Sequence, residues 1–154
     1  MSQFVNVAAY RFVRLEEPVA LRGELRELCE QHGLKGTILL APEGINLFLA
    51  GERPGVDALL ARLRGLPGLA DLEVKESLSA DQPFERLLVK VKPEIIAFGD
   101  PDIAPQEYTS RKLPPRELRQ WLAEQRDILL YDVRNDYEVK VGTFSGAVPA
   151  GVDN

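Results

Sequence analysis

The sequence predicts an α+β fold, namely a ferredoxin-like βαββαβ sandwich with one additional strand. Two short apolar runs, residues 37–41 and 45–49, flank the tripeptide Pro42-Glu43-Gly44 and are rich in residues that favour strands. A segment with helical periodicity precedes this pair of strands, and another follows it. Because crossover connections in a sheet are right-handed, this order places both helices on one face of the sheet and leaves the other face open.

The tripeptide predicts a β-hairpin. Pro42 holds φ at about −65°, and Gly44 can adopt a positive φ that a side chain would resist, so the chain can reverse here with little strain. Neither apolar run alternates with polar residues, which indicates a sheet position with one covered face and a mostly apolar opposite face. Glu43 and Asn46 have two interpretations, turn chemistry or contact with a ligand, and turn chemistry is favoured.

The remaining elements of this sandwich are two helices and two outer strands. Residues 4–13 are rich in β-forming residues at both parities and predict a central strand, and residues 72–75 alternate like a half-exposed strand. Residues 17–33 and 54–65 each begin with a proline in the first turn and end at a glycine, as helices do. Each helix has one apolar stripe: Leu21, Leu25, Leu28 and His32 in the first, and Val56, Leu59, Leu60 and Leu63 in the second.

The additional strand, residues 86–92, carries a row of cations. Arg86, Lys90 and Lys92 share one side of the strand because successive side chains point to opposite faces. Lys35, just before the hairpin, extends this basic surface. The cations have two interpretations: contacts with nucleic-acid phosphates, or an edge strand that its lysines protect from aggregation, which the residues by themselves favour.

Three aromatic residues, Tyr10, Phe12 and Phe48, are placed by the strand pattern where they could form a platform like that of RNA-recognition domains. The glycine-aromatic signature of those domains is missing. We therefore expect these rings to pack in the core.

The second half of the chain predicts a linker and an incomplete αβ segment. Residues 1–98 form the ferredoxin-like domain, and the proline-rich residues 99–114 have the composition of a linker. Residues 115–124 predict a helix and residues 128–133 a buried strand. About 40 residues cannot close a sheet or bury its faces, so residues 115–154 either pack on the first domain or open a truncated domain that is partly disordered.

Composition indicates a soluble, cytoplasmic, globular protein. The chain has 154 residues, of which 45% are hydrophobic and 28% charged, and neither a membrane span nor a signal peptide is visible. The formal net charge of −5 argues against non-specific coating of nucleic acid, and we expect no DNA or membrane partner, although a local basic stripe is compatible with an acidic total.

The chain has one cysteine and one histidine, which limits its chemistry. Cys29 lies within an amphipathic helix with nothing to lower its pKa, so a structural thiol is favoured over a nucleophile. His32 cannot supply a histidine-based metal cluster or a catalytic triad by itself, and at a helix end it is expected to interact with the dipole. No phosphate-binding or dinucleotide glycine fingerprint is present. We expect neither a metal nor a cofactor in this part.

Two long motifs carry a family resemblance. Residues 132–139, DVRNDYEV, and 142–148, GTFSGAV, resemble the opening segment of a rhodanese domain. Together with residues 35–46, KGTILLAPEGIN, and the tripeptide at 82–84, QPF, they resemble the rhodanese-related tRNA uridine hydroxylases over essentially the whole chain. One departure is Leu47-Phe48, where many members have Gly-Thr, so no role is carried over to that end of the hairpin.

The resemblance implies a tRNA substrate whose wobble uridine becomes 5-hydroxyuridine. It also implies that the family's catalytic cysteine lies beyond Asn154, so that these residues include no catalytic group and are inactive by themselves. tRNA is then the expected partner of Lys35, Arg86, Lys90 and Lys92. The alternative is a module that binds a protein or small ligand and is attached to a rhodanese domain.

For Asp132 and Arg134 the resemblance leaves two interpretations of equal weight. They either shape the mouth of the rhodanese active loop, or form an ion pair or turn cap at a strand end. Asp136 lies just beyond them.

Overall fold

The computed structural model describes residues 3–95 and 104–152. The chain forms two compact units, Met1–Thr109 and Ser110–Asn154. The boundary between them falls in the segment that the sequence predicts as a linker, residues 99–114, of which 99–103 lie outside the described residues.

The first unit contains a five-stranded sheet. Its strands are β1 (Phe4–Phe12), β2 (Lys35–Ala41), β3 (Gly44–Gly51), β4 (Lys75–Ser79) and β5 (Leu87–Val91), in the spatial order β4-β1-β3-β2-β5. The pairs β4–β1, β1–β3 and β3–β2 are antiparallel, whereas β5 is parallel to β2. This is the βαββαβ order with β5 as the additional strand, which confirms the predicted fold class.

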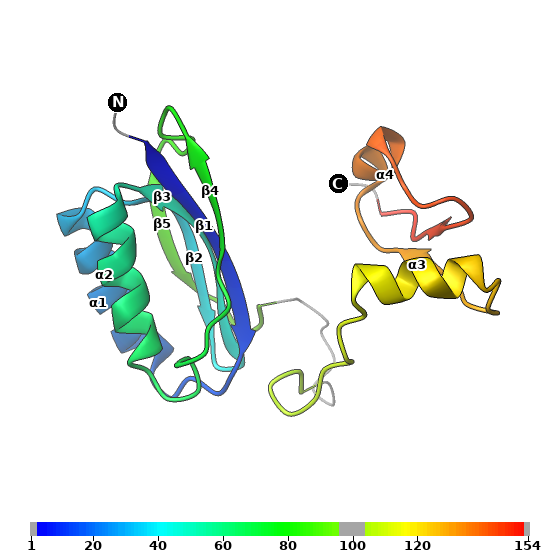
Figure 1. Cartoon of the computed structure of the whole chain (residues 1–154). Coiled ribbons are helices and arrows are strands. Elements are labelled where there is room, and N and C mark those ends of the chain that lie inside the picture. Colours follow the sequence, from blue (N-terminus) through cyan, green and yellow to red (C-terminus); the bar gives the residue numbers. More distant parts are fainter. Residues whose placement is uncertain (1–2, 96–103, 153–154) are drawn as a thin grey trace. The chain divides into compact units, whose positions relative to one another are not determined.

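Two helices, α1 (Pro18–Gln31) and α2 (Arg53–Arg64), lie on the same side of the sheet (Figure 1). Each has a proline in its first turn, as predicted. Their apolar stripes and the facing side chains of β1, β2 and β3 form a continuous core that includes Leu25, Cys29, Leu59, Leu63, Val7, Ile38, Leu40 and Leu47. No helix among the described residues of this unit covers the other side of the sheet, and we call that side the open face.

The hairpin between β2 and β3 depends on glycine backbone geometry at both ends. Gly44 has φ of 148°, and a Cβ atom built there would lie 2.1 Å from the carbonyl oxygen of Arg11. Gly36 has φ of 125°, and its Cβ would lie 2.1 Å from the carbonyl oxygen of Phe48. The predicted positive φ at Gly44 is confirmed, and the close approach at Gly36 shows why a side chain is excluded there.

The fourth strand lies later in the chain than predicted. The sequence predicts a strand over residues 72–75, but β4 begins at Lys75, where the antiparallel pairing of Lys75 with Ala8 starts. The side chain of Leu72 is part of the hydrophobic core, and the amide of Leu72 closes a turn by donating to the carbonyl oxygen of Leu69 at 3.0 Å. The buried and exposed alternation thus comes from a turn that packs on the core, and pairing with β1 overrides the weak strand propensity of Lys75–Ser79.

The second unit contains four short elements: α3 (Pro115–Ala123), β6 (Tyr131–Asp132), α4 (Asp136–Val141) and β7 (Val148–Pro149). The predicted helix over residues 115–124 is confirmed. The predicted buried strand over residues 128–133 is wrong, because only two of its residues pair, with β7, and Leu129 and Val133 are 74% and 66% exposed.

The exposure of these side chains has a simple cause. No described residue from 110 to 152 is buried, since two short helices and a two-residue parallel pair offer too little surface to cover a strand on either face. Backbone hydrogen bonds from Val148 N to Leu130 O and from Ala150 N to Asp132 O, both 2.8 Å, hold residues 148–150 beside β6.

Among the described residues, we find no helix with the length and apolar character needed to cross a bilayer.

Candidate nucleic-acid interface

Side chains on the open face form rows that run across the strands. Val7, Leu47 and Ile38 point into the core, so their neighbours along each strand point to the open face. The ladder registers give one row of Lys75, Ala8, Phe48, Thr37 and Leu88, a second of Tyr10, Asn46, Leu39 and Lys90, and a third of Ser77, Asn6, Ala50 and Lys35. Residues far apart in the sequence therefore share one surface.

Lysines are the only charged residues at open-face positions within these five strands. They are Lys35 on β2, Lys75 on β4 and Lys90 on β5, and all three side chains are exposed. None of these three lysines forms an ion pair with a carboxylate within residues 3–95 and 104–152. The open face therefore has a positive charge although the whole chain carries a formal net charge of −5.

Arg86 and Lys92 extend this charge at the two ends of β5. The amide of Gly36 donates to the carbonyl oxygen of Arg86 at 2.9 Å, and the amide of Lys92 donates to that of Leu40 at 2.8 Å. Both flanking residues thus continue the β2–β5 ladder and have the same parity as Lys90. The structure brings the four predicted cations Lys35, Arg86, Lys90 and Lys92 to one edge of the sheet.

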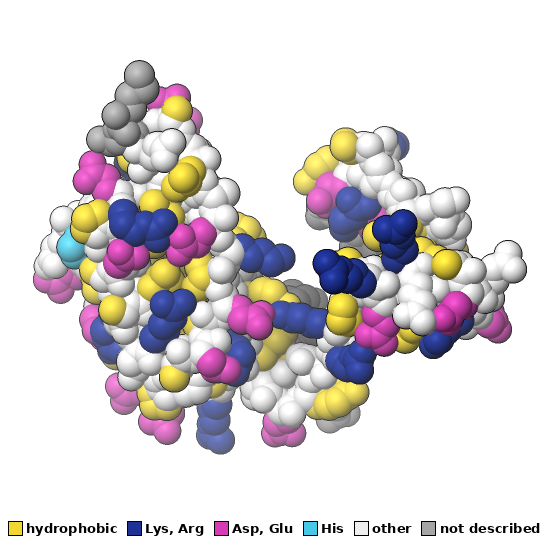
Figure 2. Space-filling model, in the orientation of Figure 1, with side chains coloured by type: hydrophobic (Ala, Val, Ile, Leu, Met, Phe, Trp, Pro, Cys, Tyr) yellow, Lys and Arg dark blue, Asp and Glu magenta, His cyan; other side chains and the backbone are white. Residues whose placement is uncertain are grey.

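Charges on the helix side are arranged differently, because four arginines there have carboxylate partners, while Arg22 and Arg64 donate to backbone carbonyl oxygens. The ion pairs are Arg11–Asp71 at 3.1 Å, Arg53–Glu76 at 2.9 Å, Arg26–Glu30 at 2.8 Å and Arg62–Glu24. Hydrogen bonds from Arg53 and Arg62 lower the pKa of Glu76 and Glu24, respectively. Figure 2 shows basic and acidic side chains side by side over α2. Ion pairs thus offset much of the positive charge on the helix side, whereas no open-face lysine has a carboxylate partner among the described residues.

Tyr10, Phe12 and Phe48 lie on the open face instead of in the core, so the expectation of core packing is wrong. Tyr10 and Phe48 are 51% and 54% exposed, and Phe12 is half-buried, with the same strand parity as Tyr10. The rings of Tyr10 and Phe12 form an edge-to-face pair with centroids 6.3 Å apart. The parity of β1 and β3 requires this exposure, since Ala9 and Leu47 take the core positions beside them.

Glu43 has a structural role, as the favoured interpretation predicts. Its carboxylate Oε1 accepts a hydrogen bond from the amide of Ile95 at 2.6 Å, and its carbonyl oxygen accepts one from Val13 at 2.9 Å. The turn therefore fastens the segment that follows β5. Asn46, by contrast, is half-buried on the open face between Tyr10 and Leu39.

Gln82, from the tripeptide at 82–84 that contributes to the family resemblance, attaches the β4–β5 connection to the sheet. Its side-chain amide donates to the carbonyl oxygen of Ala50 at 2.9 Å, and its Oε1 accepts from the amide of Phe84 at 3.3 Å. This connection leads directly into β5 and thereby positions its cations.

Cys29 and His32 do not form a reactive centre. Cys29 is fully buried in the core, and burial raises the pKa of its thiol to about 12. His32 is exposed at the C-terminal cap of α1. Within the part of the chain that the structure describes, no group of three or more His, Cys, Asp or Glu residues is arranged to hold a metal ion.

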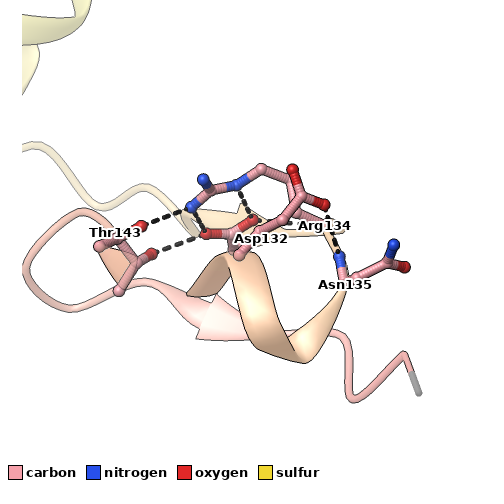
Figure 3. Close-up of polar contacts among 6 residues, drawn as sticks. Asp132, Arg134, Asn135 and Thr143 are labelled. Atoms are coloured by element: carbon pink, nitrogen blue, oxygen red, sulfur yellow. Dashed lines mark hydrogen bonds and ion pairs between the residues drawn. The ribbon is translucent and has the colours of Figure 1, made fainter. Parts of the chain in front are cut away.

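In the second unit, Asp132 and Arg134 form a bidentate ion pair at the end of β6 (Figure 3). Arg134 Nε and Nη2 lie 2.9 Å and 2.6 Å from Oδ1 and Oδ2 of Asp132, and the hydroxyl of Thr143 donates to Oδ2 at 2.7 Å. Hydrogen bonds from Arg134 and Thr143 hold the pKa of Asp132 well below its usual range. Arg134 Nη2 also donates to the carbonyl oxygen of Gly142 at 2.8 Å.

This cluster fastens the loop after α4 to the end of β6, which is the geometry expected of a strand-end ion pair. The same residues line a cavity of about 540 Å³, together with Leu130, Tyr131, Gly142, Phe144 and Ala147. Asp136 is the first residue of α4, and the amide of Asn135 before it donates to Glu138 Oε2 at 3.2 Å.

Sequence reasoning missed Lys75 and Thr143. Lys75 lies on the open face because β4 begins there and pairs Lys75 with Ala8, and a strand over residues 72–75 does not predict this pairing. Thr143 lies 11 residues after Asp132, and nothing in their spacing indicates that the hydroxyl reaches the carboxylate.

Proteins named tRNA uridine(34) hydroxylase are similar to the chain: that of Cupriavidus taiwanensis is 50% identical over 151 residues, covering 95% of this chain and 54% of the relative. The relative from Thiobacillus denitrificans is 47% identical over 153 residues, covering 96% of this chain and 62% of the relative. The chain thus spans a little more than half the length of these relatives.

Two solved structures of acylphosphatases align with part of the chain. An acylphosphatase from Coxiella burnetii aligns with 58% of this chain and 94% of its own, at 19% identity and a TM-score of 0.42. An acylphosphatase from Bacillus subtilis aligns with 58% of this chain and 99% of its own, at 11% identity and a TM-score of 0.38.

Residues 4–95 match the model of the UPF0176 acylphosphatase like domain. That match covers more than half of the chain, and the relatives named above confirm the relationship to tRNA uridine hydroxylases that the motifs predicted. The chain therefore belongs to the UPF0176 family.

Proposed function

We propose that the chain is part of a tRNA uridine(34) hydroxylase, which forms 5-hydroxyuridine at the wobble position, and that its open face binds the tRNA. The observation that carries this proposal is the group of five cations, Lys35, Lys75, Arg86, Lys90 and Lys92, on or beside one face of the sheet. The names of the relatives support the substrate.

These cations favour contact with phosphates for an electrostatic reason. None of the five has a carboxylate partner within the described ranges of the chain, so no ion pair must be broken when a phosphate approaches. Each phosphate that a lysine or arginine neutralises releases condensed counterions, which drives binding at low salt. Protection of the two edge strands from aggregation accounts for Lys75 on β4 and Lys90 on β5. It does not account for Lys35, which lies on the interior strand β2.

The chemical step requires a group other than Cys29. A thiol that is buried and protonated at neutral pH is neither accessible to a nucleobase nor nucleophilic. We therefore propose that the hydroxylase uses the cysteine of a rhodanese domain, of which residues 115–154 form the opening segment. Under this proposal, the 154 residues by themselves are catalytically inactive and need no cofactor. We expect the protein to act in the cytoplasm, where its tRNA substrate is found.

A salt titration of tRNA binding by the 154-residue chain tests the proposed interface. The logarithm of the binding constant should fall linearly with the logarithm of salt, with a slope of about −0.7 to −0.9 for each phosphate contacted. Lys35→Gln combined with Lys90→Gln should weaken binding and make the slope less negative. Arg26→Gln on α1 removes the same kind of charge from the helix side and should leave the slope unchanged.

Absence of tRNA binding at low salt would contradict the proposed interface and favour a module for a protein or small ligand. Catalysis is tested separately by incubating the chain with tRNA and measuring 5-hydroxyuridine by mass spectrometry. We expect none. Product that persists in Cys29→Ala would contradict the assignment of the chemistry to a cysteine outside this chain.

A further inference from the structure

We propose that the open face holds single-stranded nucleotides of the anticodon loop, with one base stacked on Phe48 and another on Tyr10. This inference rests on the proposed function and goes beyond it, because it assigns recognition of unpaired bases to two aromatic residues. Phosphate contacts by themselves fix position but do not distinguish a loop from a duplex.

The two rings lie on neighbouring antiparallel strands. Tyr10 is opposite Asn46, and Phe48 is two residues further along β3, so the rings form a diagonal pair whose backbones are about 7–8 Å apart. Both rings are about half exposed. Each ring can therefore take a separate base.

Small side chains leave the Phe48 ring accessible from both sides. In its row, Ala8 lies on one side and Thr37 on the other. Neither is large enough to cover an aromatic ring. Aromatic rings exposed on a sheet are the usual platform for unpaired bases, because every base has a π-face to stack on.

Cations lie in the same rows as the rings. Lys75 is two strands from Phe48 in its row, and Lys90 is in the row of Tyr10. A backbone whose bases stack on the rings would thus have phosphates on either side within reach of a lysine. This combination of a positive surface and stacking rings is typical of single-strand binding.

The same charges argue against a second copy of the chain as the occupant. A twofold dimer docks one patch on itself, which would bring the Lys35, Lys75 and Lys90 side chains of two copies together with no acidic residue at an open-face strand position to oppose them. Polar residues, among them Asn6, Asn46 and Ser77, also interrupt the apolar surface. An RNA strand carries negative phosphates, which can pair with these lysines. It also has flat bases, which can stack on the two exposed rings.

The test compares binding of the 154-residue chain to an unpaired RNA heptamer with an anticodon-loop sequence and to a fully paired RNA duplex. Phe48→Ala and Tyr10→Ala should each weaken heptamer binding roughly 5- to 100-fold without changing the salt slope, since neither ring contacts a phosphate. Lys90→Gln should instead make the slope less negative by about 0.7. Phe48→Trp should restore binding because it keeps the stacking surface.

Leu78→Ala is the matched control, because Leu78 is an exposed apolar residue of β4 at a position that points to the helix side. It should leave heptamer binding unchanged. Urea unfolding of each variant verifies that it is folded.

Three outcomes would overturn the inference: equal affinity of Phe48→Ala and wild type for the heptamer, tighter binding of the duplex than of the heptamer, or a wild-type dimer that Phe48→Ala dissociates. If tRNA binding with a steep salt slope persists in these cases, the proposed function stands and only the stacking is wrong. If the chain binds no tRNA, the proposed interface itself fails.

Discussion

Ala8 lies directly opposite Phe48 in the β1–β3 ladder, and the Phe48 ring beside it is 54% exposed. A larger side chain at position 8 would bury apolar surface and stabilise the sheet. The alanine therefore leaves a possible stabilising contact unmade, as expected where a surface serves binding.

Ala8→Ile should raise the free energy of unfolding by about 0.2–1 kcal/mol, because a β-branched residue opposite an aromatic ring forms a favourable cross-strand pair. The same substitution should weaken binding of the RNA heptamer by covering the ring. Urea unfolding and fluorescence anisotropy measure the two effects. Ala8→Ser, which is small, should leave RNA binding near that of wild type, and tighter binding by Ala8→Ile would contradict the role given to Phe48.

Gly36→Ala should strongly destabilise the first unit. Its φ of 125° costs about 1–3 kcal/mol for a residue with a side chain, and its Cβ would lie 2.1 Å from the carbonyl oxygen of Phe48, so the β2–β3 ladder must also move. Gly23→Ala is the matched control, because Gly23 lies in α1 with no atom within 4 Å of its Cβ. It should stabilise the protein by about 0.5–1 kcal/mol. Denaturant midpoints compare the two, and a tolerated Gly36→Ala would contradict the hairpin geometry.

Cys29 should make stability depend on pH in the alkaline range. The thiol loses its proton near pH 9.0 when unfolded and near pH 12 when buried, so between these values the unfolded state binds fewer protons and is favoured as pH rises. The contribution is fully present below pH 9 and should fall by up to about 1.4 kcal/mol per pH unit above it. Urea unfolding at pH 8 to 10.5 measures this, and Cys29→Ala should have a shallower dependence. Fast reaction of the native thiol with a disulfide reagent at pH 8 would contradict its burial.

Asp132 should retain its negative charge in acid because Arg134 and Thr143 hold its pKa below the ordinary value of 3.8. The local structure it stabilises should therefore be intact above that value and weaken as pH falls below it. The chemical shift of the Arg134 amide, which donates to Asp132 Oδ1 at 3.2 Å, reports this titration. Asp132→Asn should abolish it and increase the mobility of residues 142–147. A midpoint at or above 3.8 in wild type would contradict the cluster.

Sequence patterns predicted the first unit well where long-range pairing agreed with local preference. The apolar stripes of α1 and α2 and the glycine of the hairpin turn each have a local cause. They could therefore be predicted from the sequence. The start of β4 was not, because Lys75–Ser79 is a strand only through its pairing with β1. The strand predicted at residues 128–133 is shorter and more exposed than its apolar residues suggest, because a unit of this size cannot bury it.

Only part of the candidate interface could be predicted from the sequence, again because pairing between strands is not a local property. Parity along one strand placed Arg86, Lys90 and Lys92 together, but the register between strands decides that Lys75, Phe48 and Tyr10 join them. The exposure of Tyr10 and Phe48 also ran against the general preference of aromatic rings for the core.

The most direct test of the open face as an RNA-binding surface is to record backbone amide spectra of the ¹⁵N-labelled chain during addition of tRNA. The amides of Lys35, Thr37, Phe48 and Lys90 should shift or broaden first, while those of α1 and α2 remain unchanged. Perturbations concentrated on α1 and α2, with the sheet amides unaffected, would contradict the assignment of tRNA binding to this face.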